Sequence, residues 1–368
     1  MNKDSWKWKT LGSISDIHDY KRKPITKKDR KIGIYPYYGA TGIQDYIDNY
    51  IFDGSFVLVG EDGAKWGANE NTAFLINGKF WVNNHAHVLQ MHNDIFPKWV
   101  VYYLNHKDLN EFITGAVVPK LNQAALRSIP IPVPFISIQK QIVEELDTLS
   151  DIITKKKEQF AELDKLAQAT FYDMFGDPIK NEKRWVNKKL SEVCHFVGGG
   201  TPPKANQNYY QGAIPWATVR DMSSFYLKNT EFKINEEAIK KSATNIIPKG
   251  SIIIATRVGL GKVCLLKQDT AINQDLKGVI PNEELNNIYL GYWFKEMADE
   301  IIANGEGATV KGVTLKFIHN LNIFLPPILF QTQFAEKIEA IDQQKALINQ
   351  SITDTQLLFD YTMDKYFN

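Results

Sequence analysis

The 368-residue sequence lacks three features that would assign it to a class at once. It has only two cysteines, Cys194 and Cys264, without the spacing of a metal site, which favours packed thiols in a reducing cytoplasm. Its formal net charge is +1, so any binding of nucleic acid must depend on local patches. The longest apolar run, residues 129–138, is broken by three prolines and the start is polar, which predicts neither a spanning helix nor a signal peptide.

Catalytic signatures are missing as well. Pro202-Pro203 follows threonine, whereas amino-methyltransferases have Asp or Asn before such a pair. Residues 259–262 lack the earlier glycine of a phosphate-binding loop, and residues 275–277 lack the upstream acid of a nuclease signature. His85 and His87 alternate along a strand with no third metal ligand in view, which favours packing or hydrogen bonding. The sequence therefore predicts no catalytic residue and no metal site.

The most informative feature that is present is an internal repeat. Residues 115–175 align without a gap on residues 307–367, and both begin with Gly-Ala-x-Val and continue through isoleucine and proline into a long amphipathic stretch. Upstream, with small shifts, Asn83 corresponds to Asn273. A period this long indicates duplication of a whole domain rather than stacking of short repeats.

Each copy reads as one globular unit followed by one long helix. Short apolar strands such as 55–59 and 251–255 precede helical stretches such as 98–112 and 288–303, so the fold class is mixed α/β. The proline-rich segments 129–134 and 325–327 are expected to act as stiff joints. The predicted boundaries are two globular domains and two helices, in the order 1–134, 135–176, 177–326 and 327–368.

Apolar residues in both long helices recur at alternating spacings of four and three, which is typical of a coiled coil. A stripe sustained for about five heptads needs a partner of equal length, and the other copy is the obvious partner. The alternative is that each helix packs only on its own unit. The predicted seam residues are Ile142, Leu146, Leu149, Ile153, Phe160 and Leu163, with Phe334, Ile338, Ile341, Ile348, Ile352 and Phe359 in the second copy.

Loops rich in basic, aromatic and amide side chains are candidate DNA contacts. Seven cations lie between Lys21 and Lys31, a density that suits phosphate neutralisation, although a solvated loop is equally compatible. Arginine can read guanine, and asparagine or glutamine can read adenine. The candidates are Lys21, Arg22, Lys23, Tyr37, Tyr38, Thr41, Lys65, Trp66, Asn84, His85, Lys120, Lys204, Trp216, Thr218, Arg220, Asp221, Arg257 and Lys262.

With these features the sequence resembles the specificity subunit of type I restriction-modification enzymes over essentially its whole length. The paired joint-and-helix segments carry the likeness, together with the loops 37–42, 60–63, 83–87, 199–202, 214–216 and 273–275. Phe324 departs from the pattern, because the first copy has Pro132 there.

This resemblance implies two target-recognition domains that each read half of a split double-stranded DNA site, and an antiparallel coiled coil that fixes the gap. It also implies that two methyltransferase subunits dock alongside, joined by restriction (translocase) subunits in the full complex. S-adenosylmethionine, ATP and Mg would then bind those partners, with no cofactor on this chain. Two other classes stay open: an adaptor that binds only protein, and a nuclease or methyltransferase with cryptic motifs.

Overall fold

The computed structural model describes residues 3, 6–115, 117–307 and 311–368, which form two compact units. Unit 1 comprises Met1–Glu158 with Asn349–Asn368, and unit 2 comprises Gln159–Ile348. Each unit therefore contains half of each predicted long helix, instead of one globular domain with one helix. Ala116, Ala308 and Val310 of the repeat lie outside the described residues. Over the described ranges, no helix is both long enough and apolar enough to cross a membrane.

Unit 1 is built on a six-stranded sheet with the order β2-β7-β5-β6-β3-β4, in which only β3 and β6 run parallel. A separate ribbon pairs β1 with β8. The elements are β1 (Lys7–Thr10), α1 (Leu11–Ile14), β2 (Ser15–Ile17), η2 (Asp19–Lys21), η3 (Lys27–Asp29), β3 (Ile32–Gly39), β4 (Gly42–Ile47), β5 (Phe52–Gly60), β6 (Ala73–Val82), β7 (Ala86–Met91), α2 (Pro97–His106), η4 (Asn110–Phe112), α3 (Gln123–Ser128) and β8 (Pro130–Val133).

Unit 2 repeats this plan with its main sheet divided in two. The sheets have the orders β10-β18-β15-β16-β12 and β13-β11-β17-β14, and a ribbon pairs β19 with β9. The elements are β9 (Val186–Lys189), α5 (Leu190–Val193), β10 (Cys194–Gly198), η5 (Gln207–Tyr210), β11 (Ile214–Ala217), η6 (Val219–Asp221), β12 (Tyr226–Leu227), β13 (Phe232–Ile234), α6 (Glu236–Lys240), β14 (Ile246–Ile247), β15 (Ile252–Ala255), β16 (Val263–Leu266), β17 (Thr270–Ile272), β18 (Leu276–Pro281), α7 (Asn287–Glu296), α8 (Ala298–Ala303), α9 (Leu315–Asn320) and β19 (Asn322–Leu325).

The second half of β5 and the whole of β15, the central strands of the two units, are apolar because both of their faces are covered. Along β5, Val57 and Val59 point to the core beneath α2, while Phe56 and Leu58 enter a second apolar cluster on the opposite face. In β15, residues 252–255 alternate in the same way between two clusters. Successive strand residues face opposite sides of a sheet, so a buried sheet requires this continuous run.

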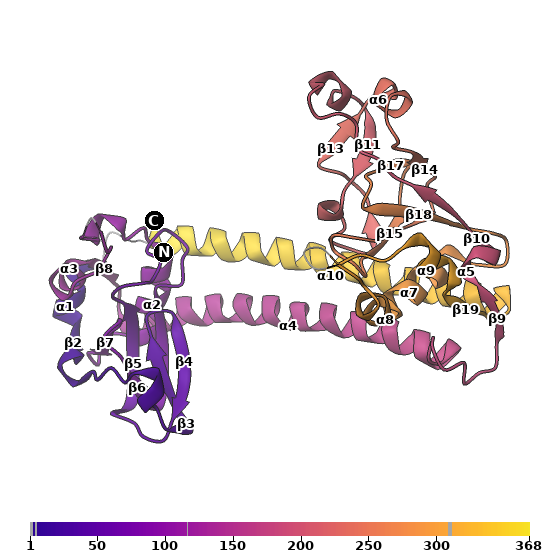
Figure 1. Cartoon of the computed structure of the whole chain (residues 1–368). Helices are drawn as coiled ribbons and strands as arrows, with labels where there is room; N and C mark the ends of the chain where they lie inside the picture. Colours follow the sequence, from indigo (N-terminus) through magenta and orange to yellow (C-terminus); the bar gives the residue numbers. More distant parts are fainter. Residues whose placement is uncertain (1–2, 4–5, 116, 308–310) are drawn as a thin grey trace. The chain divides into compact units, whose positions relative to one another are not determined.

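The two long helices are α4 (Ile136–Phe175) and α10 (Ile328–Phe367), each of 40 residues and therefore about 60 Å long. Both run without a break (Figure 1). Within unit 2, Lys345 Nζ lies 2.6 Å from Asp164 Oδ1, and Phe334 packs on Phe171 and Phe175, so the helices are antiparallel there. The predicted class, with its internal repeat and antiparallel helices, is confirmed.

In each unit, the last residue of the long helix that belongs to the other copy of the repeat packs into the core. In unit 1, Phe367 of α10 packs on Trp99 with 4.6 Å between ring centroids, and Trp99 Nε1 donates to the Pro132 carbonyl at 2.9 Å.

Unit 2 closes with the equivalent residues. Phe175 of α4 packs on Tyr289 at 4.7 Å, and Tyr289 Oη donates to the Phe324 carbonyl at 2.7 Å. Pro132 and Phe324, where the sequence departs from its own repeat, thus supply the same backbone oxygen and lie in equivalent ribbons, so the difference leaves the architecture unchanged.

The predicted stiff joints coincide only in part with strands: β8 takes in most of the first proline-rich segment, whereas β19 ends at Leu325 and Pro326 and Pro327 follow it. Ile131 and Ile323 are fully buried in β8 and β19, which pair with β1 and β9. Prolines are tolerated in β8 because a two-stranded ribbon leaves backbone groups that need no strand partner. Each long helix therefore starts from a segment that is hydrogen-bonded to the beginning of its own repeat.

Candidate nucleic-acid interface

A pocket of about 490 Å³ opens in unit 2 among the loops that follow β10, β11 and β17. Its apolar wall is aromatic: the rings of Tyr210 and Trp216 meet edge-on with 5.9 Å between centroids, and Phe232 packs beside them. Its polar lining consists of Thr201, Lys204, Gln207, Thr218, Arg220, Asn273, Gln274 and Asp275. Guanidinium, amide and hydroxyl groups beside aromatic rings form a set that can hydrogen-bond base edges and stack on bases.

Arg220 is held at the rim of this pocket by a capped turn. Thr218 Oγ1 accepts a hydrogen bond from the Arg220 amide at 3.3 Å, and Asp221 Oδ2 accepts from the Thr218 amide at 2.7 Å. This reciprocal pair fixes the backbone of η6 and leaves the Arg220 side chain exposed. Asp221 also accepts from the Glu231 amide, so its carboxylate is occupied in shaping the loop.

A second basic side chain, Arg257, follows the end of β15. Its Nη1 lies 3.6 Å from Asp275 Oδ1, and its side chain is 58% exposed while that of Asp275 is 16% exposed. Lys262 is exposed in the same loop. Unit 2 thus presents several cations around the pocket, from loops at one end of its sheets.

In unit 1 the loops after β5 and β6 occupy the equivalent places. His85 Nδ1 donates to Asp62 Oδ1, and Asn84 is exposed beside it. Lys65 is 78% exposed and lies 3.6 Å from Glu70. These side chains lie at the carboxyl ends of their strands, where loop residues are free to meet a ligand.

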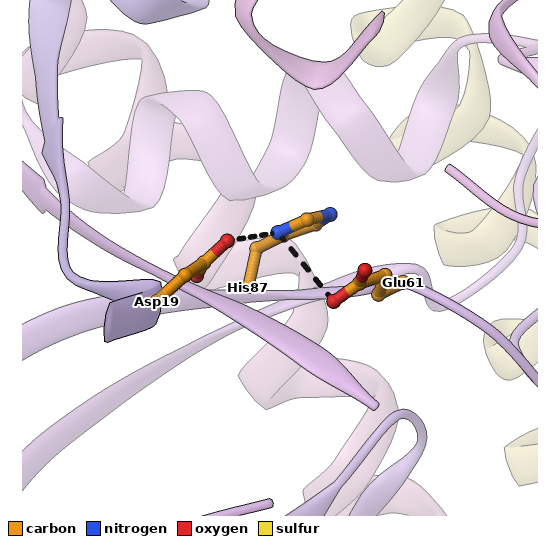
Figure 2. Close-up of side chains that lie close together, drawn as sticks. All are labelled: Asp19, Glu61 and His87. Carbon is orange, nitrogen blue, oxygen red and sulfur yellow. Dashed lines mark hydrogen bonds and ion pairs between the residues drawn. The ribbon is translucent and has the colours of Figure 1, made fainter. Parts of the chain in front are cut away.

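Beneath these loops lies a buried charged network (Figure 2). His87 Nδ1 lies 2.6 Å from Asp19 Oδ2 and 3.9 Å from Glu61 Oε2, while its Nε2 donates to the Leu121 carbonyl at 2.7 Å. Arg22 Nη1 donates to Glu61 at 2.5 Å, and Lys120 Nζ lies 2.7 Å from the other carboxylate oxygen.

Both carboxylates of this network are paired with basic side chains. Asp19, Glu61 and His87 offer ligand atoms within 4.8 Å of one another, as a metal site would, but Arg22 and Lys120 already pair with the carboxylates. Burial alone would raise the pKa of both acids. Hydrogen bonds from His87 to Asp19, and from Lys120 and Arg22 to Glu61, outweigh burial and lower both pKa values. The network ties η2 to β5 and β7 and supports the loops above it.

The structure divides the predicted DNA contacts into three groups. Lys21, Lys23, Thr41, Lys65, Asn84, His85, Lys204, Arg220, Arg257 and Lys262 are exposed. Lys120 and Thr218 are half-buried, and so are Arg22 and Asp221, whose charges are paired or hydrogen-bonded inside the fold. Tyr37, Tyr38, Trp66 and Trp216 are buried.

The buried aromatic residues support loops. Trp66 Nε1 donates to the Gly60 carbonyl at 3.1 Å, and Tyr37 Oη accepts from the Ile25 amide at 2.9 Å. Of these four, only Trp216 borders the pocket. Tyr37 and Tyr38 lie in β3 and Trp216 lies in β11, so three of these aromatic residues belong to strands and not to the loops that the sequence suggested. Their rings are buried because each removes a large apolar surface from water.

Burial differs among the predicted seam residues. Six are buried: Ile142, Leu146, Ile153, Phe334, Ile338 and Ile341. The other six are half-buried: Leu149, Phe160, Leu163, Ile348, Ile352 and Phe359. Of these, Leu163 packs against the core of unit 2 and Phe359 against the core of unit 1. That all twelve form one continuous seam stays a prediction.

Gln207, Tyr210 and Phe232 line the pocket but were not among the candidates, and Gln274 and Asp275 entered only as part of the loop 273–275. Two strands, β11 and β12, separate Tyr210 from Phe232 in the sequence, so no local pattern joins them. A signal was available for Gln274, since it directly follows Asn273, which the repeat had aligned with Asn83.

The duplicated unit and its exposed basic and amide loop side chains define the class: a recognition protein built from two copies of one unit. The family model described as "Type I restriction modification DNA specificity domain" matches residues 3–163 and 182–355. The chain therefore belongs to this family, and it is a non-catalytic DNA specificity subunit of the type I restriction-modification class.

Similar proteins agree along the whole chain. A Haemophilus influenzae protein, provisionally named as a type I restriction enzyme specificity subunit, is 28% identical over 98% of this chain and 92% of its own length. The specificity subunit of the Escherichia coli EcoR124I/EcoR124II enzyme is 30% identical over 68% of this chain and 64% of its own. The crystal structure of an S subunit from M. genitalium superposes with a TM-score of 0.61 at 15% identity, covering 99% of this chain and 96% of that one, which supports the fold.

Proposed function

We propose that the two units each read one half of a bipartite double-stranded DNA site, and that the chain carries the methyltransferase and restriction subunits of a type I restriction-modification complex. The observation that supports this most is that the whole unit is duplicated, including the contact by which the end of a long helix completes each core. Trp99 with Phe367 and Tyr289 with Phe175 make the same contact in the two units. Two equivalent readers in one chain suit a target with two half-sites, because binding the first makes the second encounter intramolecular.

The exposed basic side chains support two kinds of DNA contact. Lys21, Lys23 and Lys65 are exposed on unit 1 and suit phosphate contacts, which add affinity for every sequence. Arg220 lines the unit 2 pocket and has a fixed backbone, which suits contact with a base edge.

Exposed apolar side chains near the start of each long helix support docking of partner subunits. In unit 1, Phe135 is 80% exposed and Trp8 is 62% exposed; in unit 2, Leu329 is 64% exposed. Large apolar residues in water near a repeated structural feature are typical of protein contacts. Because the repeat supplies this feature twice, we expect two methyltransferase subunits, which bind S-adenosylmethionine, while the restriction subunits bind ATP and Mg.

The DNA target favours the cytoplasm, the compartment expected from the low cysteine content. Burial raises the pKa of the Cys194 and Cys264 thiols to about 12, in keeping with packed thiols.

The test is to purify the complex with its methyltransferase subunits and map methylated adenines on genomic DNA. We expect one split motif with a fixed gap and binding that weakens steeply with salt. In the Arg220→Ala complex one half of the motif should become degenerate while the other is retained. Unchanged affinity and an unchanged motif would show that Arg220 reads no base.

The same experiment decides the two rival classes. An adaptor that binds only protein would give a complex with no salt-dependent affinity for duplex DNA. A cryptic enzyme would methylate or cleave DNA as the purified chain alone, supplied with S-adenosylmethionine or Mg.

A further inference from the structure

One corner of the backbone is the same in both units. In unit 1 the Glu61 amide donates to the His85 carbonyl at 2.9 Å, and in unit 2 the Thr256 amide donates to the Asp275 carbonyl at 2.9 Å. These bonds join the segment after the central strand, β5 or β15, to the loop before β7 or β18.

A second pair of bonds fixes the register on the other side of the corner. The His85 amide donates to Asn83 Oδ1 at 2.8 Å, and the Asp275 amide donates to Asn273 Oδ1 at 3.1 Å. Position 85 therefore corresponds to position 275, and position 62, one residue beyond Glu61, corresponds to position 257.

The side chains at these two positions are exchanged in charge between the units. In unit 1 the carboxylate comes from Asp62 and the basic group from His85. In unit 2 the basic group comes from Arg257 and the carboxylate from Asp275. The backbone of the corner is the same in both units, but the acidic and basic residues have exchanged positions. Each unit therefore has one acid–base pair at this corner, in opposite orientations.

In both pairs the carboxylate is the less exposed partner. The Asp62 side chain is 21% exposed against 46% for His85, and that of Asp275 is 16% exposed against 58% for Arg257. The acid is thus placed to hold the base, and the base is placed to meet a ligand. Asp275 also lines the pocket described above, next to Gln274.

A paired base is suited to reading hydrogen bonds rather than to neutralising phosphate. The Asp275 carboxylate, 3.6 Å from Arg257 Nη1, offsets part of the attraction that Arg257 would exert on a phosphate and favours side-chain orientations that keep the guanidinium beside it. Two parallel N–H donors of a guanidinium match O6 and N7 of guanine. His85, whose Nδ1 donates to Asp62, presents one nitrogen, Nε2, to a ligand.

We propose that this corner is a specificity-determining position in each unit, and that in unit 2 Arg257, oriented by Asp275, reads a guanine in the major groove of its half-site. Asp62 orients His85 at the corresponding position of the first half-site. Asp62 and Asp275 are positioning residues, since they act through their basic partners. This inference rests on the proposed function, because it assigns a base reader within the bipartite site.

The test uses complete complexes with the methyltransferase subunits, and measures both the methylated motif and the affinity for duplexes substituted at each position of the motif. Arg257→Lys keeps the charge and removes the paired donors. It should lower affinity for the wild-type site by about tenfold or more, and one guanine position in one half-site should become degenerate. Arg257→Gln is a second variant at this exposed position that should relax the same motif position.

Asp275→Asn should relax the same position to a smaller extent, and should add nothing in the Arg257→Lys background. A merely structural aspartate would lower affinity further in that background. Asp62→Asn is the matched control in unit 1 and should change only the other half-site. Thermal melting of each complex checks that the fold is retained.

Two results would overturn the proposal. One is an unchanged motif in both Arg257 variants. The other is a loss of affinity that is uniform over all sequences, with a salt slope reduced by about one, as for a phosphate contact. If the wild-type complex itself bound no split site, the proposed function would fail instead, so the two failures are distinguishable.

Discussion

Replacing Gln331 by leucine should destabilise unit 2, because it removes a set of side-chain hydrogen bonds that is present in both copies of the repeat. Gln331 is fully buried in the first turn of α10. Its Nε2 donates to the Pro326 carbonyl at 2.8 Å and to the Glu284 carbonyl at 3.0 Å, and its Oε1 accepts from the Asn286 amide at 2.8 Å. Gln139 makes the same three bonds in unit 1.

The magnitude follows from these three bonds. Each contributes about 1 kcal/mol net, so their loss costs about 3 kcal/mol before the polar groups left behind are counted. The Pro326 carbonyl, which stays buried without a partner, costs about 1 to 3 kcal/mol more, whereas burial of the leucine side chain stabilises by about 2 kcal/mol. We expect Gln331→Leu to lower the free energy of unfolding of unit 2 by about 3 kcal/mol.

The assay is urea denaturation together with hydrogen exchange of the Asn286 amide, which localises the effect to unit 2. Gln333→Leu is the matched control, because Gln333 is exposed on the same helix two residues later. Asn286 should lose protection only in the Gln331 variant. A difference between the two variants of less than about 1 kcal/mol would refute the reasoning that these bonds join helix and unit.

Three further outcomes are expected. A fragment of residues 1–176, produced with the methyltransferase subunits, should dimerise and methylate a palindrome, because Phe175 of a second copy can replace the missing end of α10; a monomer in light scattering would contradict this. Asp19 and Glu61 have pKa values below their ordinary 3.8 and 4.5, so each stabilises the fold when the pH is above its ordinary pKa, and this stability is lost as the pH falls through the folded-state pKa. Because Glu61→Gln removes one of these groups, its melting temperature should vary less between pH 3 and 6 than that of the wild type. Ile341→Asp would place a charge in the unit 2 core and should cost several kcal/mol in denaturant unfolding, with loss of split-site binding; wild-type stability would contradict it.

The sequence by itself determined the features that depend on local periodicity and on the repeat. The spacing of Ile142, Leu146 and Ile153 requires a helix with one apolar face, because 3.6 residues per turn bring such positions together. An alignment without gaps shows that residues 307–367 repeat the structure of 115–175 wherever the fold is described. The continuous apolar run of β5 likewise required a strand covered on both faces.

Only the tertiary structure decided how each unit is completed and which charges are free. Phe367 reaches the core of unit 1 from the far end of the chain, and no local pattern links it to Trp99. Arg22 lies in a basic run that suggested phosphate contacts, yet it forms an ion pair with Glu61, the residue that directly follows β5. Arg257 and Asp275 meet only because strand pairing brings their loops together. Side-chain partners so distant in sequence are set by packing, which composition and periodicity do not encode.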